Sequence, residues 1–492
     1  MPPLGLLVFV VGAGSLGAEI AGVRLLAPYF GASTIVWANT ISVVLVALSL
    51  GYWLGGRLAD RHPTRRALCL LSLGAAVLLA AVPFAGRPLL EAGTTALDDV
   101  SVGAFFGSLA AVSVLLSVPI LLMGAVSPWA LRLAVRGVED AGTVAGRLYA
   151  ISTAGSLAGT LLSALLLIPA IGTRSTFIVL ALAMAATAVL GLRPRRLFAA
   201  VPLAIGALLV VPEGSIETVA SDERVLYQTD TAYQFASVLE RRDGTRLLQL
   251  NEGQAVHSKL RPGSYLTDDY WDDMLVLPSV ALGRAPRRVA ILGNGGGTTA
   301  RALGHYFPET QVDAVEIDPA LTAIGRRYFD LRGPRLRVHA ADARVFLRRS
   351  KGGYDAILLD VYRQPYIPFY MVTREFFALA RGRLAPGGAV VVNAGHPEGD
   401  HELERVLTST LRSVFPHVVS DPVTSTNSQL VATARPFSPQ PAALPSELRP
   451  VASAAAARLR AASGGGSIYT DDRAPVEWLI DRSIVRYAER AR

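Results

Sequence analysis

Apolar residues divide the chain into two parts of different character. Residues 1–212 contain six apolar runs of about 20 residues, the length that a helix needs to cross the hydrocarbon core of a bilayer. These runs lie near residues 4–28, 33–56, 67–85, 103–130, 146–171 and 173–192. A seventh run, residues 197–211, is shorter and contains Pro202. The pattern predicts a multi-span α-helical membrane domain over residues 1–212, with six or seven spans.

The charges between these runs predict the orientation of the membrane domain. Segments 57–66, 132–147 and 193–196 are rich in arginine, whereas segment 87–100 contains three acidic residues. Arginine-rich loops are retained in the cytoplasm, so the N-terminus is predicted to be cytoplasmic. Six spans place residues 213–492 in the cytoplasm, and seven place them outside. We favour the cytoplasm, because the chemistry inferred below uses a cytosolic metabolite.

Two ionisable residues, Glu19 and Arg24, fall inside the first apolar run. Ionisable side chains at membrane depth often bind a cation or a polar substrate. The alternative is that Arg24 reaches the interface and Glu19 is paired, and both interpretations stay open. Gly51, Gly55 and Gly56 in the second run are predicted to serve close helix packing.

The second part of the chain changes to alternating strand-like and helix-like segments. Strands are predicted at residues 288–292, 311–317, 335–339, 356–359 and 389–393. Strands that alternate with helices indicate a doubly wound parallel sheet, which binds ligands at the carboxyl ends of its strands. We therefore predict an α/β domain in this half of the chain.

Composition supports the division and excludes several classes of protein. Residues 1–212 hold 13 arginines and seven acidic residues, and the remaining 34 basic and 32 acidic residues lie in 213–492. Most of the net charge of +8 therefore belongs to the membrane part. The nearly balanced second half has no basic face for nucleic acid. Cys69 is the only cysteine, which excludes an intrachain disulfide and a cysteine-based zinc site; no metal site is predicted.

A glycine-rich loop follows the first predicted strand and contains Gly293, Gly295 and Gly297. Such a loop lets the backbone approach a ligand at a helix N-terminus. Glu316 ends the second strand, where an acidic side chain accepts ribose hydroxyls. The pair fits dinucleotide and S-adenosyl cofactors equally well, and a tight structural turn is the alternative. Asp342 after the third strand suits an adenine amine, or else a helix N-cap.

One loop of the membrane part resembles a transporter motif. Residues 56–66 are similar to the G-x-L-A-D-R-x-x-R-R loop between the second and third helices of major facilitator transporters. A complete transporter of that type has about twelve spans, roughly twice the number predicted from span-length runs in this chain. The resemblance implies a domain like half of such a transporter.

Residues 228–395 resemble the polyamine aminopropyltransferase family, which includes spermidine synthase. Residues 230–234 are similar to the family's first strand with its Tyr-Gln pair, and 250–258 to its D-G-x-x-Q-x-T hairpin. Residues 271–275 fall at its Y-H-E-M-L motif, and the glycine loop, Glu316, Asp342 and Asp360 follow in family order. The resemblance implies a small β-domain (213–284), a Rossmann-like domain of S-adenosylmethionine-methyltransferase type (285–435) and a tail (436–492) with an Asp-Asp-Arg-Ala-Pro-Val-Glu motif.

The implied reaction transfers the aminopropyl group of decarboxylated S-adenosylmethionine to an amine and releases methylthioadenosine. No cofactor is tightly bound, and the nucleoside is a co-substrate. The amine is an ammonium ion at neutral pH, with a pKa near ~10, so a carboxylate must accept its proton. The match implies the following roles: Asp360 as catalytic base; Gln234, Gly293, Gly295, Gly297, Glu316 and Asp342 for the nucleoside; and Asp272, Asp273, Tyr270 and Tyr362 for the amine.

Some residues depart from the family pattern. The D-S-x-D-P motif is replaced by residues 360–365, which lack the second Asp and contain Arg363. The glycine loop lacks its Asp, and Trp271 replaces a tyrosine. An arginine beside a polyamine site would repel the substrate unless it points away. Putrescine as the acceptor therefore does not follow from the resemblance.

Two alternatives remain open. One is a methyltransferase that uses S-adenosylmethionine, with Arg363 pairing with its carboxylate. The other is a non-catalytic module that binds a nucleoside or polyamine and regulates the membrane part or is linked to transport. The expected partners are a small amine and the lipid bilayer, with a homodimer as the expected assembly. We expect a multi-pass protein of the cell membrane with a cytoplasmic catalytic domain.

Overall fold

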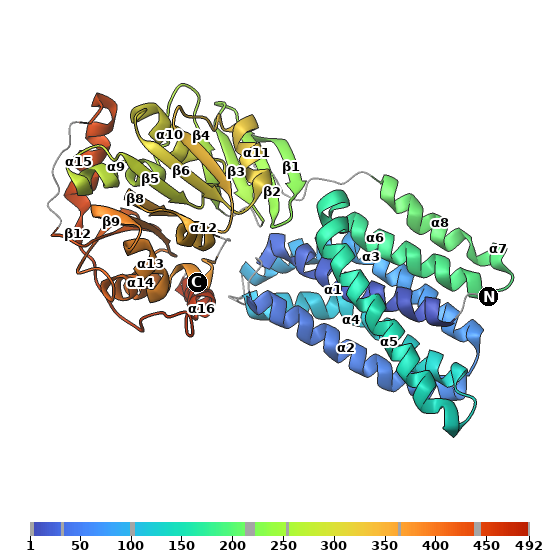
Figure 1. Cartoon of the computed structure of the whole chain (residues 1–492). Helices are drawn as coiled ribbons and strands as arrows, with labels where there is room; N and C mark the ends of the chain where they lie inside the picture. The colour runs from blue at the N-terminus through green and yellow to red at the C-terminus, as the bar shows by residue number, and fades with distance from the viewer. Residues whose placement is uncertain are drawn as a thin grey trace. The chain divides into compact units, whose positions relative to one another are not determined.

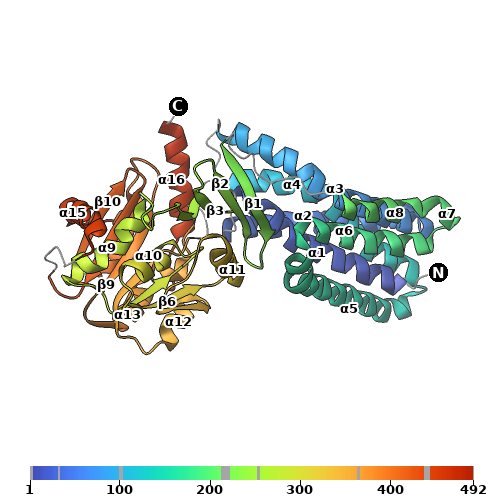
Figure 2. The same cartoon turned by 90° about the horizontal axis from the view of Figure 1, so that it is seen from above.

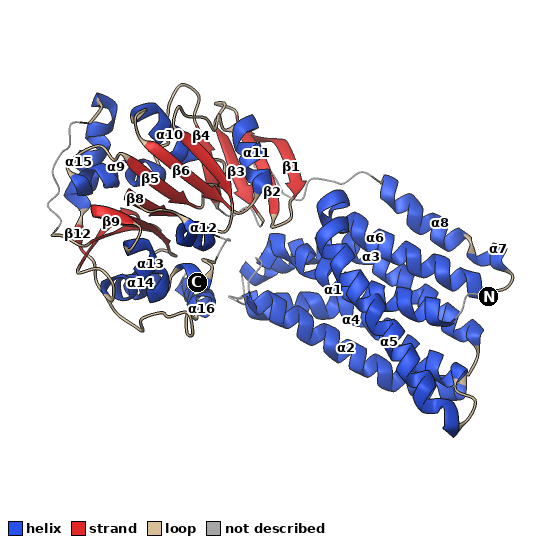
Figure 3. Ribbon diagram, in the orientation of Figure 1, coloured by secondary structure: helices blue, strands red, loops and turns tan. Residues whose placement is uncertain are grey.

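The computed structural model describes residues 4–30, 34–98, 104–211, 222–251, 255–362, 366–436 and 444–490. The chain forms two compact units (Figure 1). The first comprises Met1–Thr218 and Thr229–Phe235, and the second comprises Val219–Gln228 and Ala236–Arg492. Figure 3 shows that long helices build the first unit, whereas strands and shorter helices build the second.

The long helices of the first unit run alongside one another (Figures 1 and 2). They are α1 (Leu4–Phe30), α2 (Thr34–Arg61), α3 (Arg65–Asp98), α4 (Ala104–Ala134), α5 (Val138–Leu162) and α6 (Ile168–Gly191). A π-helical turn, Ser163–Leu167, joins α5 to α6, which breaks at Gly172 with φ 80° and ψ 168°. The break falls between the runs predicted at 146–171 and 173–192.

Five stretches among the described residues are long and apolar enough to cross a membrane. They are Leu4–Ala27, Ile35–Arg61, Arg65–Gly86, Phe105–Ala134 and Val138–Gly191, the last of which contains both of the final two predicted spans. The seventh predicted run forms the short helices α7 (Arg195–Phe198) and α8 (Ala200–Ala207) and a 3-10 turn. An eight-residue helix is about 12 Å long, so α8 alone cannot cross the hydrocarbon core.

Small residues bring pairs of these helices into close contact. A Cβ atom on Gly51 would lie 2.2 Å from the Leu121 carbonyl oxygen, and one on Gly159 would lie 2.0 Å from that of Ala13. Glycine therefore sets the backbone separation of α2 from α4 and of α5 from α1, as small residues do between membrane helices. The packing prediction is confirmed for Gly51 and Gly55, but a Cβ on Gly56 would meet no atom within 4 Å.

The second unit contains two sheets. The smaller has the order β1 (Glu223–Asp230), β2 (Phe235–Arg241), β3 (Arg246–Leu250) and β4 (Val256–Leu260). The larger has the order β12-β10-β11-β9-β8-β5-β6-β7. Its strands are β5 (Arg288–Leu292), β6 (Gln311–Glu316), β7 (Leu336–Ala340), β8 (Tyr354–Leu359), β9 (Leu384–Gly395), β10 (His417–Thr424), β11 (Asn427–Thr433) and β12 (Arg460–Ala461).

Five neighbouring strands, β7, β6, β5, β8 and β9, are parallel, so the prediction of a parallel Rossmann-like sheet is confirmed for this part. Strands β11, β10 and β12 add an antiparallel edge that the sequence pattern did not predict. The chain leaves β5 toward β6 and β7, and later returns on the other side of β5 to form β8. The point where the order reverses, between β5 and β8, is where folds of this kind bind ligands.

Helices cover both faces of the larger sheet (Figure 1). On one face lie α9 (Tyr270–Leu282), α10 (Thr298–Tyr306) and α15 (Arg449–Arg458), and on the other α12 (Ala343–Arg349), α13 (Arg374–Arg381), α14 (Glu402–Arg412) and α16 (Val476–Arg490). Helix α11 (Pro319–Tyr328) follows β6. Along β5, Val289 and Ile291 enter one core and Ala290 and Leu292 the other. Burial on both faces explains why the parallel strands are continuous apolar runs.

Candidate active site

The ends of β5 and β8 meet at the point where the strand order reverses. The Asp360 amide donates to the Leu292 carbonyl at 2.9 Å, and the Gly293 amide donates to that of Val315 at 3.0 Å. Gly293 has φ 83°, and a Cβ there would lie 2.2 Å from the Asp360 carbonyl oxygen. Only glycine permits this approach. The predicted base and the predicted nucleoside loop are therefore adjacent.

The Glu316 carboxylate holds the glycine loop. Its Oε2 accepts hydrogen bonds from the amides of Gly295 at 2.8 Å and Asn294 at 3.2 Å, and its Oε1 accepts one from Asp318 at 3.0 Å. Burial raises the pKa of Glu316 to about 7, and these hydrogen bonds oppose the shift. An ionised carboxylate offers about four acceptor positions, so capacity remains for a hydroxyl group. The ribose role of Glu316 stays a prediction.

The β4 strand secures the loop from the smaller sheet. The Gly296 amide donates to Ser258 Oγ at 2.7 Å, and the Lys259 amide donates to Thr298 Oγ1 at 2.9 Å. Gly295 and Gly297 have φ of 52° and 93°. A side chain on Gly297 would also meet Leu331 at 2.3 Å, so the turn into α10 requires glycine there.

Buried polar atoms without partners lie at this loop. Within the described part of the chain, Asn294 Nδ2 and Oδ1 and His257 Nε2 have no hydrogen-bond partner. A Cβ on Gly295 would lie 3.0 Å from the His257 carbonyl oxygen, which places His257 beside the loop. Burial lowers the pKa of His257 to about 4, so its ring is neutral. Unpaired buried polar groups are costly, and a ligand with hydroxyl or amine groups fits them.

Asp360 lies in a shell of hydrogen-bond donors. Tyr270 donates its hydroxyl to Asp360 Oδ2 at 3.1 Å, and Asn393 donates Nδ2 to Oδ1 at 2.7 Å. Burial raises the pKa of Asp360 to about 6, although hydrogen bonds from Asn393, Tyr270 and Trp271 oppose the shift. The pKa of Tyr270 is raised well above its usual value by burial and by Asp360, so Tyr270 remains a donor. A carboxylate with this pKa suits proton transfer near neutral pH.

Tyr362 is joined to the same cluster through the end of β9. Its hydroxyl accepts a hydrogen bond from the Gly395 amide at 2.5 Å and donates to the Asn393 carbonyl at 3.3 Å. Burial raises its pKa above the usual range for tyrosine. The structure therefore brings Tyr270, Asp360 and Tyr362 together. Asn393 was missed, because the sequence shows only a polar residue at the end of a buried strand.

Asp272 and Asp273 hold the protein's own structure together. Asp272 accepts hydrogen bonds from the Thr267 amide and hydroxyl and from the Asp268 amide, and so fixes the turn before α9. Asp273 pairs with Arg458 of α15, which also pairs with Asp421 of β10. Burial raises the pKa of Asp273 to about 6. These contacts leave the amine role of both carboxylates a prediction.

Asp342 begins α12, and the N-cap alternative is confirmed. Its Oδ1 accepts a hydrogen bond from the Val345 amide at 2.9 Å, and its Oδ2 accepts one from the Tyr370 hydroxyl at 2.9 Å. Arg344 donates to the Tyr370 carbonyl at 2.9 Å and pairs through both terminal nitrogens with Asp471. Its role toward a nucleoside stays a prediction, but tyrosine and arginine contacts now link it to the C-terminal tail.

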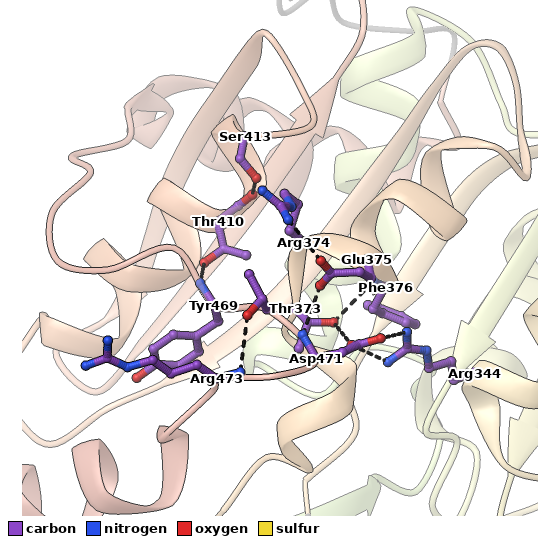
Figure 4. A network of polar contacts seen from close by, with 11 residues as sticks. Arg344, Thr373, Arg374, Glu375, Phe376, Thr410, Ser413, Tyr469, Asp471 and Arg473 are labelled. Atoms are coloured by element: carbon purple, nitrogen blue, oxygen red, sulfur yellow. Dashed lines mark hydrogen bonds and ion pairs between the residues drawn. The ribbon is translucent and has the colours of Figure 1, made fainter.

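Figure 4 shows how the tail is attached. Asp471 accepts the Thr373 hydroxyl at 2.7 Å, and its amide donates to Glu375 Oε2 at 3.0 Å. The Tyr469 amide donates to Thr410 Oγ1, and its carbonyl accepts from the Arg374 amide. The first half of the Asp-Asp-Arg-Ala-Pro-Val-Glu motif is therefore an attachment to α12, α13 and α14. No pattern in the sequence indicated these partners.

Two predicted features cannot be placed at this site. Gln234 is buried, and its amide donates to Thr231 Oγ1 at 3.0 Å, but residues Thr229–Phe235 belong to the first compact unit. Its nucleoside role stays a prediction. Arg363, with Gln364 and Pro365, lies outside the described residues. The effect of the missing second Asp therefore stays a prediction as well.

Comparison with known proteins agrees with the arrangement of this unit. Residues 270–429 match the family model described as the spermine/spermidine synthase domain. A probable polyamine aminopropyl transferase of Bifidobacterium longum is 34% identical over 215 residues, which are 43% of this chain and 47% of that protein. The polyamine aminopropyltransferase of Mycobacterium tuberculosis is 32% identical over 309 residues, with 57% of each chain covered.

The chain spans about half the length of the curated relatives it matches. Among solved structures, a probable spermidine synthase from Corynebacterium glutamicum has 22% identity and a TM-score of 0.38, and the match covers 51% of this chain and 98% of that one. The sequence relatives and the family model agree on the same segment. The C-terminal half of this chain carries a spermine/spermidine synthase domain.

Proposed function

We propose that this protein is a membrane-bound aminopropyltransferase that transfers the aminopropyl group of decarboxylated S-adenosylmethionine to a polyamine or related amine. Asp360, held by Tyr270 and Asn393 at the strand switch point, carries the proposal. It lies within the segment that matches the family, whose sequence relatives are named polyamine aminopropyltransferases. The acceptor is of the putrescine-to-spermidine type.

In the proposed reaction, Asp360 receives a proton from the acceptor ammonium. The freed amine attacks the carbon next to the sulfonium; a C–N bond forms and the C–S bond breaks, with its electron pair left on sulfur. Methylthioadenosine then leaves as a neutral thioether. A base with a pKa of about 6 is ionised at neutral pH and is close enough in pKa to accept the proton in the transition state. Tyr270 and Tyr362 offer ring faces to the cationic amine.

The nucleoside is proposed to lie across the glycine loop. Glu316 accepts the ribose hydroxyls, and Asp342 accepts the adenine amine. The unpartnered atoms of Asn294 and His257 support this placement, since a nucleoside supplies donors and acceptors for both. Asn294 stands where the family has Asp, so it retains an oxygen acceptor and gains a donor.

The N-terminal helices are proposed to anchor the enzyme as a multi-pass, half-transporter-like domain of the cell membrane. Five apolar stretches of spanning length support this role. Their outward faces are also apolar: Val46 is 59% exposed and Leu165 is 73% exposed. Such exposure costs free energy in water and none in lipid. The arginine-rich loops favour the orientation with a cytoplasmic catalytic domain.

Replacement of the proposed base is the test. In purified full-length protein, Asp360→Asn keeps the size of the side chain and removes the base. We expect methylthioadenosine production to fall by about 100-fold or more, the usual loss on removal of a general base. Nucleoside affinity, measured by calorimetry, should be largely retained. Asp472→Asn, an exposed acidic position in the tail, is the matched control. Equal turnover of Asp360→Asn and the control would remove Asp360 as the base.

A further inference from the structure

We propose that His396, His401 and Glu404 form a binding site for a divalent transition-metal ion. One ligand atom from each residue lies within 4.8 Å of the others. His396 follows directly after β9, His401 precedes α14, and Glu404 lies in the first turn of α14. The sequence analysis predicted no metal site, because it searched for cysteine and for established motifs. Three donors brought together by a strand end and a helix start are a signal that only the fold provides.

The hydrogen bonds around His396 leave one ring nitrogen free to bind a metal. Its Nδ1 faces the Pro397 carbonyl at 3.1 Å, and a carbonyl can only accept, so Nδ1 carries the proton. Its Nε2 faces Ser428 Oγ at 3.4 Å. Ser428 donates its single proton to Glu404 Oε2 at 3.1 Å. A neutral His396, which is 7% exposed, therefore points a lone pair at an oxygen with no proton to give.

A metal ion supplies what this lone pair lacks. Metal-binding histidines commonly donate their other ring nitrogen to a backbone carbonyl, which fixes the tautomer and the orientation of the ring. The His396–Pro397 contact has this form. The remaining explanation for the contact is a second proton on His396, and the experiment below distinguishes the two.

The carboxylate of Glu404 is held in place by its own donors. Ser420 donates to Oε1 at 2.6 Å and Ser428 to Oε2 at 3.1 Å, while His401 Nδ1 lies 3.2 Å from Oε2. Hydrogen bonds to a ligating carboxylate orient it toward the metal. Glu404 is buried and His401 is exposed, so one side of the cluster is rigid and the other is open to solvent.

The donor set favours zinc or a neighbouring first-row metal over magnesium or calcium. Two imidazoles suit Zn²⁺, Co²⁺, Ni²⁺ and Cu²⁺, whereas Mg²⁺ and Ca²⁺ require oxygen ligands. With metal–ligand distances of about 2.0–2.1 Å, ligand atoms around tetrahedral Zn²⁺ lie roughly 3.4 Å apart. The exposed His401 side chain can close the difference by rotating. Two histidines and a glutamate leave a fourth position for water.

The site has a structural connection to the candidate active site. Asn393, which binds Asp360, and Gly395, whose amide binds Tyr362, immediately precede His396 on the same strand. A metal that joins His396 to α14 would fix the end of β9. Metal binding does not require aminopropyl transfer, so this proposal and the proposed function can fail separately.

Binding is measured on the full-length protein in detergent, after removal of metals with a chelator. Co²⁺ is the probe, because its visible absorption reports coordination directly, and elemental analysis after Zn²⁺ loading gives the stoichiometry. We expect one equivalent per chain. His401→Ala alters an exposed side chain and carries little folding risk, and His396→Ala tests the buried ligand. Both should weaken binding by about 100-fold or more, beyond the 10–100-fold cost of losing a supporting contact.

His417→Ala, a change at the start of β10 outside the cluster, is the matched control and should bind like the parent. A Co²⁺ spectrum that is absent from the parent protein, or unchanged by His401→Ala and His396→Ala, would overturn the proposal. A protonated His396 without metal predicts this negative result. Loss of binding in both cluster variants, with the control unaffected, supports the site.

Discussion

At the scale of single residues, the chemistry of the candidate site depends on how Asp360 is solvated. Burial disfavours its charge, and donors from Asn393 and Tyr270 restore part of the stabilisation that water would give. The balance leaves a pKa of about 6, which suits a base at neutral pH. Each donor is therefore predicted to tune the acidity of Asp360.

Tyr270→Phe should shift the pH dependence of turnover. The Tyr270 hydroxyl stabilises ionised Asp360, so its loss raises the pKa of Asp360. The acid limb of kcat/KM, which should lie near pH 6 in the parent protein, is expected to move to higher pH. Tyr306→Phe removes a comparable bond to Glu447 outside the site and should leave the profile in place. A profile of Tyr270→Phe that coincides with the parent's, or moves to lower pH, contradicts this role.

Gly293 is the residue on which the meeting of two strand ends depends. Gly293→Ala should destabilise the domain through two effects: a positive φ, which costs about 1–3 kcal/mol for non-glycine residues, and contact with the Asp360 carbonyl. Gly353→Ala also has positive φ, but its Cβ would meet no atom within 4 Å. Thermal unfolding should show the larger loss at Gly293. Equal losses at the two positions would mean that the close approach is relieved at little cost.

At the scale of elements, helix starts and strand ends place the proposed functional groups. The parallel strands could be predicted because burial on both faces makes them continuous apolar runs, and Gly293, Glu316 and Asp360 stand at their ends. Asn393, His257 and the His396 cluster could not, because their roles depend on partners far away in the sequence. The antiparallel edge and the attachment of the tail were missed for the same reason.

The tail is predicted to act on Asp342 through α12. Asp471→Asn weakens the pair with Arg344, whose contact with Tyr370 supports the tyrosine that binds Asp342. A partly exposed ion pair contributes up to about 1 kcal/mol, so the KM for the nucleoside should rise roughly fivefold, with a smaller effect on kcat. Asp472→Asn is the neighbouring control. A lower kcat with unchanged KM would indicate another role for Asp471.

At the scale of the whole molecule, an apolar helical unit and a synthase-type domain share one chain. The helical half was evident from run length and loop charge, which are local properties of the sequence. The number of spans was harder to predict, since Gly172 divides one long helical stretch and the last run forms only short helices. The side of the membrane on which the catalytic domain lies depends on that number.

The membrane account predicts two results in a bacterial host. The protein should stay with the membrane fraction after an alkaline carbonate wash, because its apolar stretches are inserted rather than adsorbed. In spheroplasts, external protease should leave the C-terminal unit intact until the membrane is opened. Release by carbonate would contradict insertion, and cleavage of the C-terminal unit in closed spheroplasts would place it outside.

The most direct measurement of the central claim is the release of methylthioadenosine by the purified full-length protein. Decarboxylated S-adenosylmethionine is supplied with and without each of a panel of amines, and the products are identified by mass spectrometry. We predict methylthioadenosine only when an amine is present, together with an equal amount of that amine extended by one aminopropyl group. Nucleoside binding without either product, or methyl transfer from intact S-adenosylmethionine in its place, would contradict aminopropyl transfer.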